Sequence, residues 1–187
     1  DLGDIYKGET VQDTYFALQS TLTLLIEKKI IPIILGGTQD LTYANYRAYD
    51  NLVPMVNIVN VDCKFDLGDS TKAIKNNSFV GKIILDEPCN LFSYANIGYQ
   101  TYFNSQEEID LMQKLYFETY RLGEITNDIK VVEPVLRDAN VVTIDLKSVK
   151  GAEVSLKQKF SPNGLDGKEI CAISRYAGIS NKVTSFG

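Results

Sequence analysis

Aspartates come directly after several apolar runs of the chain. Asp62 and Asp66 follow one run, Asp145 follows another, and Asp40 lies just beyond a Gly-Gly pair. Carboxylates that converge on one point repel each other unless cations or protons neutralise them. Two interpretations are therefore open. The four acids form one ligand or metal site, or each one caps backbone N–H groups at the start of its own loop, as aspartate commonly does.

Lysines lie among these acids. Lys64 stands between Asp62 and Asp66, and Lys147 follows two residues after Asp145. A protonated lysine donates hydrogen bonds to carboxylates but cannot ligate a cation. A divalent ion about 4 Å from one ammonium group would be repelled by about 8 kcal/mol before relaxation, at an effective dielectric constant near 20. The three negative charges of Asp62, Asp66 and Asp145 nearly balance the two positive charges of these lysines, so we predict that the five residues form a salt-bridge cluster without metal.

The chain has no histidine, although about four would be expected at this length. This excludes an imidazole metal ligand, a histidine general base and a Ser–His pair within the chain. Cys63 lies beside the acids but has no imidazole to activate it, so we expect it to fill space. The three cysteines are odd in number and scattered, which favours buried thiols in a reducing compartment, and hence a cytoplasmic location, over a disulfide framework.

The composition is that of an ordinary globular domain, with 44% apolar and 23% charged residues. No apolar run approaches the ~20 residues that span a bilayer. The net charge is −5, and no dense stripe of lysine and arginine interrupts it. We therefore expect neither a nucleic acid nor a membrane as a partner.

Helical and strand patterns alternate along the whole chain. Helices are expected at 14–29, at 43–49 with Asp40 or Thr42 as N-cap, at 79–85, from the Ser105/Glu108 capping box through Tyr120 to a stop at Gly123, at 128–138 and at 166–177. Strands are expected at 30–35, 55–61, 91–97 (broken by Gly98), 141–146 and 183–186, and loops at 69–78 and 147–162. The alternation predicts one α/β domain over residues 1–187, a three-layer α/β/α fold with a mainly parallel sheet. Ligands of such sheets bind beyond the carboxyl ends of the strands, which places residues 36–40, 62–66 and 145–147 around one crevice.

Four segments in this order resemble motifs of the arginase–agmatinase–formimidoylglutamase (ureohydrolase) family. The segment 31–42 (IPIILGGTQDLT) resembles a strand ending in Gly-Gly-Asp-His-Ser, and 61–66 (VDCKFD) resembles Asp-Ala-His-x-Asp. The segment 143–147 (TIDLK) resembles Ser-x-Asp-x-Asp, and 162–165 (PNGL), with Glu169, resembles a Pro-x-Gly-Leu stretch before a late helix. The resemblance implies an arginase-like fold, two manganese ions and hydrolysis of a guanidino or amidino group. It also implies further strands before Asp1 and after Gly187, which would make the chain a fragment, and it allows a homo-oligomer.

Half of the metal-ligand positions implied by the resemblance are changed, and the family's loop histidine has no counterpart in 69–81. The changed positions are Gln39 and Lys64 in place of histidines and Lys147 in place of an aspartate. The retained positions are Asp62, Asp66 and Asp145. Their expected neighbours in the pocket are Gly36, Gly37, Thr38, Asp40 and Cys63.

Three hypotheses follow. The first is a metal-free, hydrolytically inactive ureohydrolase homologue that acts as a binding or structural protein, with an unidentified small-molecule or protein partner. The second is a divergent hydrolase of a linear amidine or guanidine, such as formimidoylglutamate, agmatine or arginine. It would hold one Mn²⁺, Mg²⁺ or Ca²⁺ on the three remaining aspartates. The third is a component of a complex whose role lies on its surface. The lysine substitutions fit a pocket retuned for another ligand, or compensation for lost metals.

Overall fold

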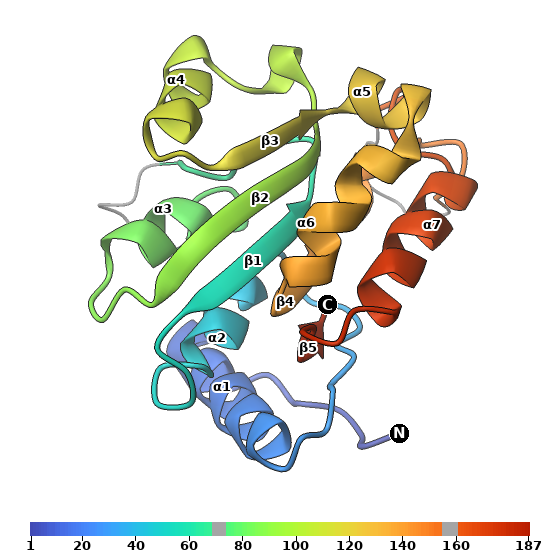
Figure 1. The fold of residues 1–187 in the computed structure, drawn as a ribbon. Helices are drawn as coiled ribbons and strands as arrows, with labels where there is room; N and C mark the ends of the chain where they lie inside the picture. Colours follow the sequence, from blue (N-terminus) through green and yellow to red (C-terminus); the bar gives the residue numbers. More distant parts are fainter. Residues whose placement is uncertain (69–73, 155–160) are drawn as a thin grey trace.

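The sheet is parallel, as expected from the sequence (Figure 1). The computed structural model describes residues 1–68, 74–154 and 161–187. Within these ranges five strands pair in the order β3-β2-β1-β4-β5. They are β1 (Val56–Val61), β2 (Leu91–Tyr99), β3 (Glu118–Arg121), β4 (Val141–Ile144) and β5 (Ser185–Phe186). Because β1 and β4 are neighbours, the polar residues that follow them are brought together.

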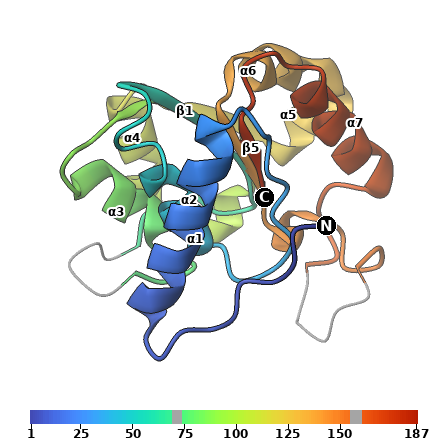
Figure 2. The ribbon, with the colours of Figure 1, turned by 90° about the horizontal axis from the view of Figure 1, so that it is seen from below.

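Helices cover both faces of the sheet, which confirms the three-layer α/β/α prediction (Figures 1 and 2). One face carries α1 (Val11–Glu27), α2 (Leu41–Arg47), α3 (Phe79–Leu85) and α4 (Gln106–Lys114). The other carries α5 (Leu122–Asn127), α6 (Glu133–Asp138) and α7 (Gly167–Gly178). Short 3₁₀ turns lie at η1 (Thr101–Phe103), η2 (Ile129–Val132) and η3 (Leu146–Ser148).

The two apolar cores follow from the alternation of side chains along the strands. In β1, Ile58 packs with Leu22 of α1 and Tyr46 of α2 in one core. The next residue, Val59, packs in the other core with Leu136 of α6. Burial on both faces favours apolar residues, and β1 is apolar except at Asn57 and Asn60. No helix in the described part of the chain is long and apolar enough to cross a membrane.

The predicted strand at 30–35 is wrong. Only Ile33 makes a bridge, to Phe186 of β5, at the outer edge of the sheet. The side chains of Ile31, Ile33 and Leu35 are 56%, 69% and 90% exposed. The apolar run suggested a strand buried on both faces, but in this structure the segment lies at an edge where little packs against it.

Two more boundaries differ from those expected. The helix predicted through Tyr120 ends at Lys114, where Tyr116 takes a positive φ of 56° and turns the chain into β3. Gly123 is therefore not a helix stop but a residue of α5. Strand β2 is not broken at Gly98, because the glycine accepts a φ of 97° and pairing resumes after a register shift. The predicted loops at 69–78 and 147–162 include residues 69–73 and 155–160, which lie outside the described ranges.

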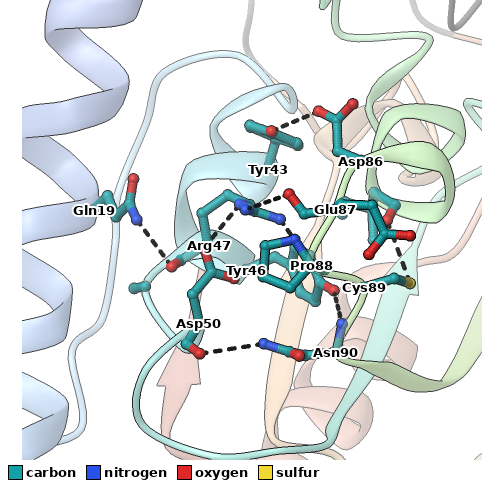
Figure 3. Close-up of polar contacts among 12 residues, drawn as sticks. Gln19, Tyr43, Tyr46, Arg47, Asp50, Asp86, Glu87, Pro88, Cys89 and Asn90 are labelled. Atoms are coloured by element: carbon teal, nitrogen blue, oxygen red, sulfur yellow. Dashed lines mark hydrogen bonds and ion pairs between the residues drawn. The ribbon is translucent and has the colours of Figure 1, made fainter.

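A polar cluster fixes α2, the helix that follows the Gly-Gly turn (Figure 3). The Arg47 guanidinium donates to the carbonyl oxygens of Glu87 (3.3 Å) and Pro88 (3.0 Å), and its Nε lies 2.9 Å from Asp50 Oδ2. The Tyr43 hydroxyl donates to Asp86 Oδ2 at 2.7 Å. These bonds tie α2 to the segment between α3 and β2, and so they set the start of α2 beside the crevice.

Candidate functional site

The expected crevice lies where β1 and β4 end. Asp62 and Asp145 are the first residues after these strands, and the backbone N–H of Asp145 donates to the carbonyl of Val61 at 2.9 Å. Asp62 is only 2% exposed, and Asp66 is 5% exposed. The structure therefore places Asp62 and Asp145 at neighbouring strand ends with Asp66 paired to Asp62, whereas Asp40, the fourth acid, lies at the start of α2.

Asp62 and Asp66 form a buried acidic pair. The backbone of Asp66 has a φ of 51°, a left-handed conformation that aspartate tolerates better than most residues. Burial, followed by the charge of Asp145, raises the pKa of Asp62 to about 6. Burial, followed by the charge of Asp62, raises the pKa of Asp66 well above its ordinary value, and no hydrogen-bond partner for its Oδ2 is found among the described residues. Both raised pKa values indicate that no cation fully neutralises the carboxylates of this pair.

Lys147 supplies part of that charge, as predicted. Its Nζ lies 3.1 Å from Asp145 Oδ2, and its backbone N–H donates to Asp145 Oδ1 at 2.8 Å. Burial favours the neutral amine, but the carboxylates of Asp145, Asp62 and Asp66 outweigh it, so the pKa of Lys147 is raised. The ammonium form is therefore the one that occupies this position.

The other half of the predicted salt-bridge cluster is wrong for the residues described. No described carboxylate forms an ion pair with Lys64, and its Nζ lies 5.7 Å from the centre of the Phe103 ring. The backbone N–H of Lys64, rather than its ammonium, donates to Asp62 Oδ1 at 3.0 Å. Lys64 is exposed, so its ammonium keeps its hydration, and the face of the Phe103 ring attracts this cation.

Gln39 joins a buried polar row that sequence analysis missed. Its Nε2 donates to Asn60 Oδ1 at 2.8 Å and to Thr143 Oγ1 at 3.3 Å. Thr143 also donates to Asn60 Oδ1, at 2.9 Å, across the paired strands β1 and β4. The detectable signal was an asparagine inside the apolar run of β1. The amide of Gln39 thus serves as a hydrogen-bonding bridge at this position.

The Gly-Gly turn shapes one wall of a cavity of about 220 Å³ beside Lys147. Gly36 and Gly37 have φ values of 92° and 83°, and a Cβ on Gly37 would lie 2.1 Å from a side-chain carbon of Leu41. Thr38 and Gln39 also line the cavity. Both glycines are therefore required by backbone geometry, as expected of a tight turn.

Two expected pocket residues take other roles. The Asp40 carboxylate accepts a hydrogen bond from the Tyr15 hydroxyl and joins α1 to the start of α2, without capping the helix through its side chain. Cys63 is buried, and burial together with the charge of Asp62 raises the pKa of its thiol. A thiol held in its protonated form is a poor nucleophile, so Cys63 fills space. The prediction of buried thiols is wrong for the other two cysteines, Cys89 and Cys171, which are exposed.

The arrangement can bind polar groups but does not gather a set of metal ligands. In the described parts of the chain, no three carboxylate or thiol groups converge closely enough to hold a metal ion. The crevice offers the Lys147 ammonium, the amide of Gln39 and the three carboxyl groups.

Comparison with known proteins identifies the family of this chain. The model of the arginase family matches residues 1–186. A formimidoylglutamase of Streptococcus gordonii is 25% identical over 202 residues that cover all of this chain and 61% of the relative. A structure of Trypanosoma cruzi formiminoglutamase with Mn²⁺ matches with a TM-score of 0.89 at 18% identity, over all of this chain and 65% of that one. Arginase from Bacillus subtilis matches with a TM-score of 0.85 at 17% identity, over all of this chain and 73% of that one. The chain thus spans less than two thirds of the length of the first two, shares the fold of the solved structures, and belongs to the arginase family.

Proposed function

We propose that this member of the arginase family has lost dinuclear manganese binding and hydrolysis and acts as a binding or structural protein. The observation that carries the proposal is the ion pair of Lys147 with Asp145. On the sequence resemblance, Lys147 replaces a metal-binding aspartate, so a positive charge stands where the family has a ligand. The raised pKa of Lys147 keeps that charge in place at neutral pH.

The remaining residues do not fit two manganese ions. Gln39 has replaced an imidazole, and its Nε2 is engaged with Asn60 and Thr143. Lys64 offers no lone pair while it is protonated. The donor set is thus reduced to three aspartates, one of which is already neutralised by Lys147.

A second candidate is a hydrolase of an amidino compound that uses one metal ion. The buried Asp62 and Asp66 pair favours it, because burial raises both pKa values and Asp66 Oδ2 has no partner among the described residues. A hard cation such as Mn²⁺ or Mg²⁺ would satisfy such oxygens. The relatives named formimidoylglutamase suggest formimidoylglutamate as the first compound to assay.

Metal content separates the two candidates. The purified protein is incubated with excess Mn²⁺, passed through a desalting column and analysed for bound metal per chain, alongside an assay for ammonia or formamide release. We expect less than about 0.1 metal per chain and no product, since the Lys147 ammonium at Asp145 repels a divalent ion. One metal per chain would support the second candidate, and two would overturn the loss of the dinuclear site.

A triple variant tests the reason for the loss. Gln39→His, Lys64→His and Lys147→Asp together restore the ligand types implied by the family. We expect this variant to bind Mn²⁺ where the wild type does not. The two lysine ammonium groups, which repel a metal ion, are replaced by side chains that can ligate it. A matched variant, Lys28→His, Lys29→His and Lys182→Asp, changes exposed lysines away from the crevice and should stay metal-free. Equal metal content in both variants would contradict the assignment of these positions.

A further inference from the structure

A second cavity, of about 600 Å³, lies at the carboxyl ends of β2 and β3. Its walls are η1, the start of α5 and the turn at Asn163, and β1 separates it from the Lys147 ion pair. The carboxyl ends of parallel strands are where such sheets bind ligands. None of the residues that line it is among the metal-ligand positions discussed above.

Arg121 stands at this cavity with unused hydrogen-bonding capacity. Its backbone is fixed, because its N–H donates to Glu124 Oε2 at 2.8 Å at the start of α5. Its guanidinium makes one long hydrogen bond, to Thr101 Oγ1 at 3.4 Å, and no ion pair with any carboxylate in the described ranges. A guanidinium has five N–H donors arranged to grip a carboxylate in a bidentate manner, so most of that capacity is available to a ligand.

Gln100, which also lines the cavity, is held in place by hydrogen bonds. Gln100 is 3% exposed, and its backbone N–H donates to the carbonyl of Cys63 at 3.1 Å. Its Oε1 accepts from the Tyr102 hydroxyl, and its Nε2 donates to the carbonyl of Asn163 at 3.3 Å. A preformed wall lowers the entropy lost when a ligand binds.

Charge and shape define the ligand class. The cavity carries one cation, Arg121, and one nearby carboxylate, Glu124, in the lining that is described. Glu124 repels any anion here, but it repels a monocarboxylate about half as strongly as a dianionic phosphate, and a single cation, Arg121, can pair with one carboxylate. Tyr99 and Tyr102 offer flat aromatic surface beside these charges. We propose that this cavity binds a small monocarboxylate with a flat, largely apolar body, held through Arg121. The proposal goes beyond the function proposed above and does not depend on it.

Ligand-observed ¹⁹F NMR with 4-fluorobenzoate tests the proposal on the protein as it stands. We expect saturable binding with a Kd of about 1 mM or tighter, a level typical of a single small anchor. Arg121→Ala should weaken binding about tenfold or more and Arg121→Lys by less, because a lysine keeps the charge but loses the bidentate geometry. Neutral 4-fluorobenzamide should bind about tenfold more weakly than the benzoate. Inorganic phosphate should not displace the bound benzoate.

Controls make the outcome decisive. Arg175→Ala removes an exposed arginine of α7 that does not line the cavity, and this variant should bind like the wild type. The thermal transition of each variant shows that it is folded, and Arg121 is exposed, so its loss should leave that transition in place. The proposal is overturned if Arg121→Ala binds like the wild type, if the benzamide binds as well as the benzoate, or if the wild type shows no saturable binding. Displacement by phosphate would overturn the choice of a carboxylate over a phosphate group.

Discussion

Asp62→Asn should stabilise the metal-free protein at neutral pH. Asparagine has nearly the same shape and can keep the hydrogen bond that Lys64 N–H donates to Asp62 Oδ1. It removes one of two buried negative charges whose pKa values are raised by burial and by neighbouring carboxylates. The gain arises because the wild type must either ionise Asp62 in a buried place or retain a proton there.

The size and pH range of the effect follow from the pKa. The folded protein holds a proton on Asp62 up to about pH 6, whereas an unfolded chain releases it near the ordinary value of 3.8. The stability of the wild type therefore falls as pH rises between these values. The difference of about two pKa units lowers the free energy of unfolding of the wild type by about 3 kcal/mol above pH 6. Below pH 4 it has almost no effect.

Urea unfolding of wild type and variant at about pH 4 and about pH 7.5, in the presence of a chelator, measures this difference. We expect similar stability at the lower pH and a more stable variant at the higher pH, with a Tm raised by about 6–12 °C. Asp4→Asn, which changes an exposed aspartate, is the control and should show no such pH-dependent gain. A variant less stable than wild type at about pH 7.5 would refute the view that the pair lacks a cation.

Three further predictions concern the surroundings of the crevice. Arg47→Ala should lower the free energy of unfolding by about 2 kcal/mol in urea, because it removes two bonds to backbone carbonyls and an ion pair, whereas Arg175→Ala should change it little. Gly37→Ala should lower Tm more than Gly36→Ala, because both strain the backbone but only the first adds a Cβ at 2.1 Å from another side chain; equal losses would contradict this. Cys63 should react with a thiol reagent only after unfolding, while the two exposed cysteines react at once; three fast thiols in the native protein would show that Cys63 is accessible.

The sequence was sufficient for the layers and for the acidic pair. The β-rich run of β1 and the helical spacing of α1 agree with the elements found, because β1 is buried on both faces of the sheet and α1 buries one apolar face. The order of the polar segments also predicted that Asp62 and Asp145 would meet, because parallel strands bring their carboxyl ends to one edge of the sheet. Strand β3 was hidden, because its pattern also fits a helix and only pairing with β2 selects the extended form.

What the sequence determined by itself is the inventory of the crevice: no histidine, three aspartates, and lysine at two altered positions. Charge counting from these residue types predicted that a lysine would neutralise a carboxylate. Only the tertiary structure decided which one, since Lys147 faces Asp145 while the Lys64 ammonium lies beside the Phe103 ring. In the sequence the two lysines have the same setting, because each follows an aspartate by two residues, Asp62 before Lys64 and Asp145 before Lys147. The difference arises because contact depends on the direction in which each strand end turns its side chains, and that direction is set by packing between distant segments.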